Sequence, residues 1–86
     1  MKLIVVGRPQ TYLENREFEA FLTRIEKEIG EIRKMSAISR DGVALVELYG
    51  IMQIPALLVT RDDGSVVGMW EGERPEFEII SAAYHS

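Results

Sequence analysis

The sequence predicts an α/β domain in which a four-stranded mixed sheet carries helices on both faces. An unbroken aliphatic run at residues 3–6 is typical of a strand buried on both sides. Residues 18–29 then repeat apolar side chains with the period of an amphipathic helix. Later, two apolar runs flank the turn at residues 61–65, which is the pattern of a β-hairpin. With a helix before and after that hairpin, the element order is βαβαββα.

Composition indicates one domain, residues 1–86, that folds without covalent or metal reinforcement. A chain of 86 residues with 47% hydrophobic side chains can bury a modest core of its own. It contains no cysteine and one histidine, His85, so disulfides, thiolate ligands and histidine clusters are excluded. We therefore expect no metal site and no cofactor.

Charge and hydropathy narrow the range of partners. The net charge of -4 opposes long-range attraction to phosphate backbones, so we do not expect nucleic acid as a partner. The apolar run at residues 3–6 is much shorter than a secretory or membrane-spanning segment. We expect a cytoplasmic protein with no membrane partner.

The helix after the first strand has two candidate starts and one candidate end. Residues 11–14, Thr-Tyr-Leu-Glu, have the form of a capping box, in which the threonine and glutamate side chains bond each other's backbone N–H groups. Asn15 is the alternative N-cap and would begin the helix four residues later. Gly30 is expected to end it in the left-handed conformation. The apolar stripe consists of Phe18, Phe21, Leu22, Ile25 and Ile29.

The middle of the chain predicts an edge strand and a short helix. Residues 32–38 form the strand, and Arg33 and Lys34 near its start discourage pairing with other chains. Asp41 is expected to cap a helix that Gly50 terminates.

The C-terminal third predicts two hairpin strands and a final helix. The strands are residues 54–59 and 66–70, and a proline at the beginning of the first is tolerated because no ladder bond is lost there. Pro75 is expected at the first position of the final helix. Trp70 is expected in the core, as a strand residue beneath a helix. The three internal methionines could form a soft binding surface, but such residues usually fill gaps in a core, so none is assigned to a site: Met35, Met52 and Met69.

Residues 49–72 resemble the C-terminal half of thioredoxins. The segment 49–58 reads Tyr-Gly-Ile-Met-Gln-Ile-Pro-Ala-Leu-Leu, and it is followed by Asp63-Gly64, valines and Gly72. Thioredoxins share the Tyr-Gly-Ile or Tyr-Gly-Val start, the Ile-Pro-Thr motif, an apolar strand, a turn glycine and a glycine ahead of the last helix. The rest of the chain matches in element order only. The resemblance places the chain in the thioredoxin-like superfamily and implies that fold.

The same resemblance implies loss of the family's chemistry. Counting back from Tyr49 by the usual interval places Thr11 and Glu14 where the two cysteines of the CxxC motif would stand. A helix N-terminus can stabilise a thiolate, but a threonine there offers no oxyanion near neutral pH. Val5 and Ser36 occupy the positions of the family's buried carboxylate and nearby lysine. We therefore expect no thiol-disulfide oxidoreductase activity and no catalytic residue.

The resemblance also implies a partner-binding face. The family's Ile-Pro bond is cis, so we expect a cis Ile54–Pro55 bond that directs the chain toward the first helix. Partners of thioredoxins are held by this loop, by residues beside the nucleophile and by the loop before the last helix. Carried over by position, the expected partner-binding residues are Gln10, Thr11, Tyr12, Ile54, Pro55, Gly72 and Glu73.

Four functional hypotheses follow, and the first is favoured. The chain is a non-catalytic binding module that holds a protein or an extended peptide segment through this face. Alternatively it is a structural subunit or homo-oligomer with a permanently covered edge or apolar face. A glutathione-type ligand bound without a thiol is a weaker alternative, because that class needs a second helical domain. A regulatory role of the circadian-clock type has no residue-specific support.

Overall fold

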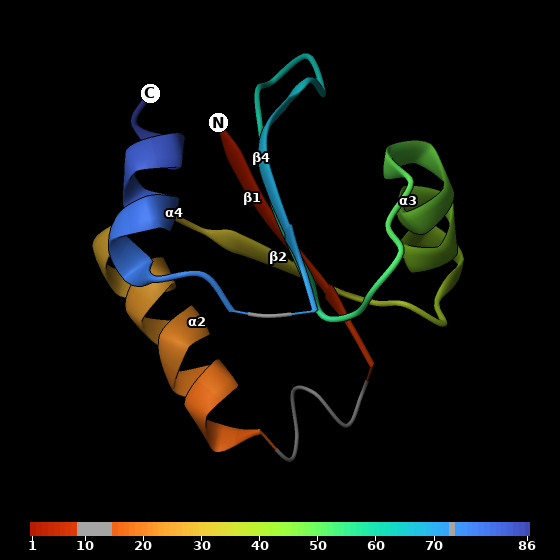
Figure 1. Ribbon diagram of the computed structural model, residues 1–86, viewed down its shortest axis with the longest axis horizontal. Helices are drawn as coiled ribbons and strands as arrows, with labels where there is room; N and C mark the ends of the chain where they lie inside the picture. The colour runs from red at the N-terminus through yellow and green to blue at the C-terminus, as the bar shows by residue number, and fades with distance from the viewer. Residues whose placement is uncertain (9–14, 73) are drawn as a thin grey trace.

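The computed structural model describes residues 1–8, 15–72 and 74–86 of the chain. Within them the elements follow the predicted order, with a strand first and a helix last (Figure 1). Their bounds are β1 Lys2–Gly7, α2 Arg16–Glu28, β2 Ile32–Ser36, α3 Arg40–Tyr49, β3 Ala56–Thr60, β4 Val66–Glu71 and α4 Phe77–Tyr84.

The described strands form one mixed sheet in the order β2-β1-β3-β4. β1 pairs parallel with β2, and Leu3 stands opposite Ile32. β1 pairs antiparallel with β3, and β3 with β4, so Val5 stands opposite Leu57. β1 therefore lies inside the sheet, and its residues 3–7 are all buried, as the aliphatic run predicted.

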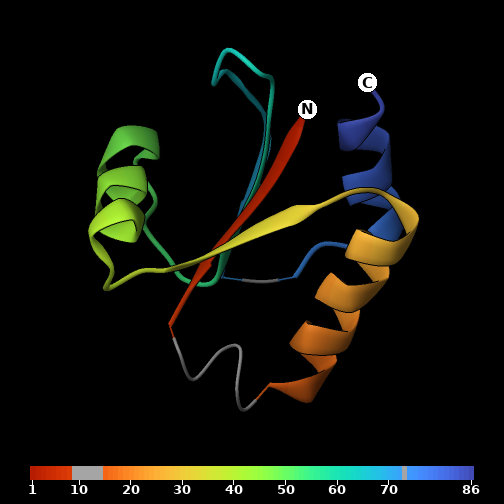
Figure 2. The same ribbon diagram turned by 180° about the vertical axis from the view of Figure 1, so that it is seen from behind.

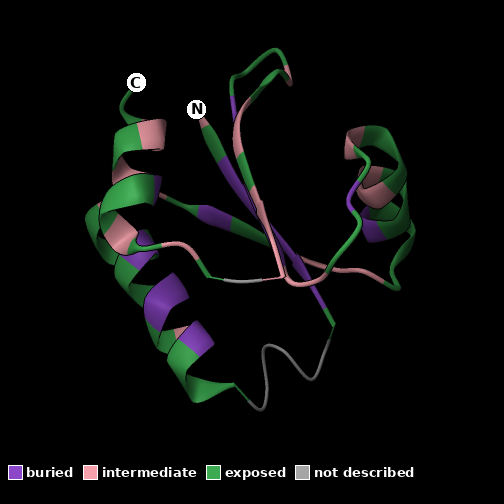
Figure 3. Ribbon diagram, viewed as in Figure 1, coloured by how far each residue is buried: buried purple, intermediate pink, exposed green. Residues whose placement is uncertain are grey.

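The sheet separates two layers of helix. α2 and α4 lie on one face and α3 on the other, and the view from behind shows the same arrangement (Figures 1 and 2). Alternate strand residues point to opposite faces: Leu3 and Val5 belong to the core under α2 and α4, while Ile4 and Val6 belong to the core under α3. Buried residues mark the side of α2 that is turned toward the sheet (Figure 3).

α2 begins after Asn15, the second of the two N-caps that the sequence offered. The side-chain oxygen of Asn15 accepts a hydrogen bond of 3.0 Å from the backbone N–H of Phe18, and Asn15 has non-helical backbone angles. A helix starting at Thr11 is therefore wrong for α2. The proposed capping box at residues 11–14 lies outside the described residues.

The role predicted for Gly30 was also wrong. Among the described residues, the glycines with positive φ are Gly50, Gly64 and Gly72, and α2 is capped by Ile29 in a right-handed conformation. A side chain at position 30 is instead opposed by packing, because a Cβ there would lie 2.7 Å from the hydroxyl oxygen of Tyr84.

Several further boundaries differ from the predictions. Ser39, and not Asp41, caps α3, because its side-chain oxygen accepts from the backbone N–H of Gly42 at 3.0 Å. Pro75 precedes α4 by two residues, with Glu76 at the N-cap. β2 ends at Ser36 rather than at residue 38. β3 runs from Ala56 to Thr60 rather than over residues 54–59, and β4 extends one residue beyond the prediction, to Glu71. The left-handed Gly50 that ends α3 was predicted correctly, with a φ of 64°.

None of the described helices is long and apolar enough to cross a membrane.

Candidate interaction face

The loop between α3 and β3 is anchored at its start. Gly50 turns the chain out of α3, and the backbone N–H of Ile51 donates to the carbonyl oxygen of Val46 at 3.0 Å. The Ile51 side chain is buried in the core under α3. The loop ends at the Ile54–Pro55 peptide bond, which is cis. The next residue, Ala56, begins β3.

Two hydrogen bonds join this loop to the end of β4. The backbone N–H of Gly72 donates to the carbonyl oxygen of Pro55 at 2.8 Å. The backbone N–H of Met52 donates to Oε1 of Glu71 at 3.0 Å. Gly72 has a φ of 78°, and a Cβ at this position would overlap the side-chain oxygen of Gln53. Residues 52–55 and 71–72 therefore form one continuous surface, which we call the Ile54–Pro55 face.

The face is neither fully buried nor uniformly polar. Ile54, Pro55 and Gly72 are half-buried, and Gln53 is exposed. Met52 is 85% exposed, so the prediction that it fills a gap in the core is wrong. Met35 does pack against the core under α3, and Trp70 packs against the core under α2 and α4 as expected.

The structure brings some of the predicted binding residues together. Ile54, Pro55 and Gly72 meet on the face through the Gly72–Pro55 hydrogen bond. The other four positions lie outside the described residues: Gln10, Thr11, Tyr12 and Glu73.

Sequence reasoning missed Met52 and Glu71 as parts of this face. Glu71 follows five uncharged residues of β4 and directly precedes Gly72. The sequence alone does not indicate that its carboxylate bonds a loop, because the partner, the Met52 N–H, lies 19 positions earlier. The exposure of Met52 has no local signal either, because loop residues lack the periodicity that marks a buried side.

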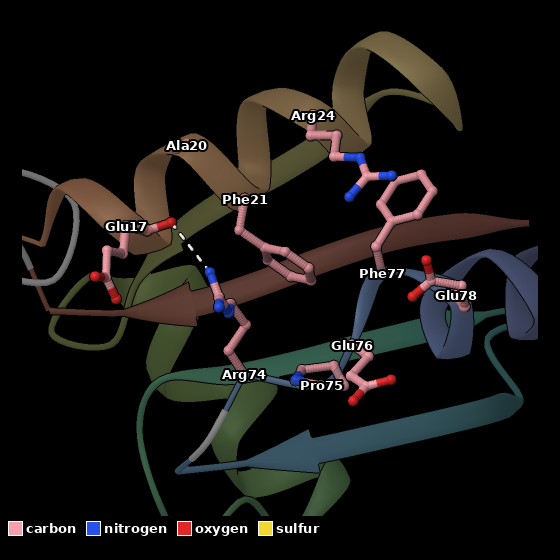
Figure 4. Close-up of a pocket in the computed structure, with 9 residues that line it drawn as sticks. All are labelled: Glu17, Ala20, Phe21, Arg24, Arg74, Pro75, Glu76, Phe77 and Glu78. Atoms are coloured by element: carbon pink, nitrogen blue, oxygen red, sulfur yellow. Dashed lines mark hydrogen bonds between the residues drawn. The ribbon is translucent and has the colours of Figure 1, made fainter.

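A second concave region lies between α2 and the segment that leads into α4 (Figure 4). It is an open groove of about 550 Å³. The Arg24 guanidinium lies 3.9 Å from the centre of the Phe77 ring. The Arg74 guanidinium lies 5.0 Å from the centre of the Phe21 ring and donates to the carbonyl oxygen of Glu17 at 3.4 Å. The arginines therefore cover aromatic rings and tie the α4 segment to α2.

The charges along this groove do not select one kind of ligand. Its lining combines two arginines with three glutamates, which would oppose an approaching anion: Glu17, Ala20, Phe21, Arg24, Arg74, Pro75, Glu76, Phe77 and Glu78. Arg24 also pairs with Glu28, with 2.7 Å between Nε and Oε2. The groove is better explained as the contact between two helical segments than as a charged binding site.

The chemistry available at the described residues is limited. The chain has no cysteine and hence no thiol for disulfide exchange. Among the described residues there is no cluster of three or more acidic or histidine side chains that could hold a metal ion. The Ile54–Pro55 face offers a loop held by hydrogen bonds, one exposed thioether, amide groups and the Glu71 carboxylate.

Comparison with known proteins agrees with the architecture. The structure is similar to that of thioredoxin 1 from the thermophilic eubacterium Thermosipho africanus TCF52B, with a TM-score of 0.68 and 10% sequence identity. The match covers 99% of this chain and 91% of that chain. No family model and no curated relative matches the sequence. At this level of identity the likeness establishes the fold: the chain has a thioredoxin-like fold and lacks cysteine.

Proposed function

We propose that this chain is a non-catalytic interaction module that binds an extended protein segment through the Ile54–Pro55 face. The observation that supports this most is the pair of hydrogen bonds, Gly72 to Pro55 and Met52 to Glu71, which fix the loop backbone while Met52 stays 85% exposed. In this proposal Gln10, Thr11, Tyr12 and Glu73 complete the same face.

A fixed loop favours binding for an energetic reason. Ordering a flexible loop on association costs free energy, so a loop that is already held by its own chain loses less on binding. The anchors at Ile51 and Gly72 supply that order here. An extended segment can then pair its main chain with the loop backbone and place a side chain against the exposed methionine, whose flexible thioether adapts to different partners.

The absence of a thiol determines what binding accomplishes. A partner held at this face cannot form a mixed disulfide with the chain, because there is no cysteine in its 86 residues. In this proposal binding is non-covalent. The chain acts by occupying a segment of its partner and not by oxidising or reducing it.

Selection from a displayed library of random extended peptides tests this function. Peptides selected against the wild type should bind Ile54→Asp and Met52→Asp at least about tenfold more weakly, which corresponds to about 1.4 kcal/mol. Val66→Asp is the matched control, because Val66 is 41% exposed and begins β4, at the opposite end of that strand from Glu71. It should bind the peptides as the wild type does.

Two results would count against the proposal. Equal binding by all three variants would mean that the peptides occupy another surface. A wild type that yields no peptide and sediments as a concentration-dependent oligomer, with Ile54→Asp remaining monomeric, would mean that a second copy of the chain covers the face. Unfolding curves for each variant establish that the comparison is made on folded protein.

A further inference from the structure

All the sulfur atoms of this chain belong to methionine residues. There is no cysteine, and the four methionines differ in their exposure. Met52 is 85% exposed and Met69 is 37% exposed. Met1 and Met35 are half-buried, and Met35 packs against the core under α3. Since an oxidant must reach the thioether sulfur, these residues should react at different rates.

We infer that Met52 is a peroxide-sensitive modification site, and that its oxidation state controls occupancy of the Ile54–Pro55 face. In the reaction, the Met52 sulfur attacks one oxygen of hydrogen peroxide and the O–O bond breaks. A sulfur–oxygen bond forms, and the proton on the transferred oxygen passes to the other oxygen, which leaves as water. Sulfur loses two electrons and peroxide gains them. The product is methionine sulfoxide, which methionine sulfoxide reductases convert back to the thioether.

The backbone around Met52 is held independently of its side chain. Its N–H donates to Glu71 at 3.0 Å, and its neighbour Ile51 is 6% exposed. Both contacts persist when an oxygen is added to a side chain that already projects into water. Oxidation should therefore leave the fold intact. Oxidation of Met35 would instead place a polar sulfoxide against apolar core residues.

The sulfoxide changes what the face presents to a partner. The thioether is apolar and polarisable, whereas the sulfoxide is polar and strongly hydrated. An apolar partner side chain that packs against Met52 would have to strip water from that group. This part of the inference rests on the proposed function. A peptide that packs against Met52 would also cover its sulfur and slow its reaction with peroxide, because the oxidant must reach that atom.

The modification site is tested by mass spectrometry, without any partner. Folded protein is treated with hydrogen peroxide, and sulfoxide at each methionine is followed over time by peptide mapping. Met52 should oxidise at least about five times faster than Met35 and also ahead of Met69. In concentrated urea the internal methionines should react at similar rates. Oxidation of Met35 or Met69 as fast as Met52 in the folded protein would overturn the assignment.

Two matched variants check that the signal belongs to Met52. Met52→Leu should remove the earliest sulfoxide and keep the wild-type unfolding midpoint, since a leucine preserves an apolar side chain of similar size. Met69→Leu should leave the earliest sulfoxide in place. If Met52→Leu forms its first sulfoxide as quickly as the wild type, another methionine is the sensitive site.

The effect on occupancy is tested with the peptides selected from the displayed library. Protein oxidised at Met52 should bind them at least about fivefold more weakly, and treatment with a methionine sulfoxide reductase should restore binding. Equal binding before and after oxidation would show that Met52 oxidation does not control occupancy of the face. It would not contradict the proposed function. If no peptide is selected, the proposed function fails and the control of occupancy fails with it. The oxidation site is decided by the mass spectra in every case.

Discussion

The backbone N–H of Gly72 donates a hydrogen bond of 2.8 Å to the carbonyl oxygen of Pro55. This contact ties the end of β4 to the start of β3 at the face where we propose that a partner binds. Gly72 adopts a φ of 78°, in the left-handed region that side chains disfavour. The contact therefore favours glycine at position 72 because of its backbone conformation.

Gly72→Ala and Gly50→Ala should each lower the free energy of unfolding by about 1–2 kcal/mol. Both glycines have positive φ, and a left-handed conformation costs a residue with a Cβ about that much. A Cβ at Gly50 would meet no atom within 4 Å, and the atom closest to a Cβ at Gly72 is the end of the exposed Gln53 side chain, which can rotate away. Urea unfolding of both variants measures the two losses. A much larger loss for Gly72→Ala than for Gly50→Ala would contradict this prediction.

Asn15→Ala should lower the free energy of unfolding by about 1 kcal/mol, the usual cost of losing an N-cap. The Asn15 side chain accepts from the Phe18 N–H at 3.0 Å, and alanine cannot replace that bond. Asn15→Asp retains an acceptor and should keep most of the stability. Urea unfolding with equal m-values compares the three proteins. An unchanged midpoint for Asn15→Ala would show that another residue caps α2.

Gly30→Ala should destabilise the contact between the end of α2 and the last turn of α4. The new Cβ would lie 2.7 Å from the Tyr84 hydroxyl oxygen and 3.0 Å from the ring carbon that bears it. Such overpacking costs about 1–3 kcal/mol. Tyr84→Phe removes the nearest atom, so the double variant should lose less than the sum of the two single losses. A double-mutant cycle measures this coupling, and strict additivity would contradict it.

The carboxyl group of Asp63 should titrate at unusually low pH. The backbone N–H of Ser65 donates to the Asp63 carboxylate at 2.9 Å, and the Ser65 hydroxyl donates at 2.7 Å. These bonds favour the charged form and lower the pKa of Asp63, with a smaller contribution from Arg61. The folded-state pKa is depressed, so the stabilising effect is present above the ordinary Asp pKa of about 3.9 and is lost as pH falls through the folded value.

Carboxyl NMR titration measures that pKa. Ser65→Ala removes the hydroxyl donor and keeps the backbone N–H, so the pKa of Asp63 should rise part of the way toward its ordinary value. A wild-type Asp63 that titrates at or above the ordinary value would contradict the hydrogen bonding described for this turn.

The element order could be predicted because the spacing of the apolar residues and the positions of the turn and cap residues indicate the same elements along the chain. The buried run of β1 and the apolar stripe of α2 are each unambiguous in period. The ends of elements were less predictable, because cap-forming residues stand close together. Asn15 competes with Thr11 in the sequence, and a side-chain hydrogen bond assigns the cap of α2 to Asn15. Asp41 was predicted to cap α3, but Ser39, two residues earlier, forms the hydrogen bond that caps it. Gly30 was misinterpreted because its constraint comes from Tyr84, more than fifty residues away.

Part of the candidate face could also be predicted from the sequence. The motif at residues 49–58, together with Gly72, indicated that Ile54, Pro55 and Gly72 would meet, and the structure places them together. The bond from Met52 to Glu71 joins residues 19 positions apart and has no local signature. The exposure of Met52 likewise depends on how the loop is anchored, which periodicity does not report.

The central claim is that the Ile54–Pro55 face binds an extended segment of another protein. Amide NMR spectra recorded while a selected peptide is titrated into labelled protein test it most directly. We predict that the largest shifts occur at Met52, Gln53, Ile54 and Gly72, with little change at Arg24 and Phe77. Largest shifts in the groove between α2 and α4, with the loop amides unmoved, would contradict the claim.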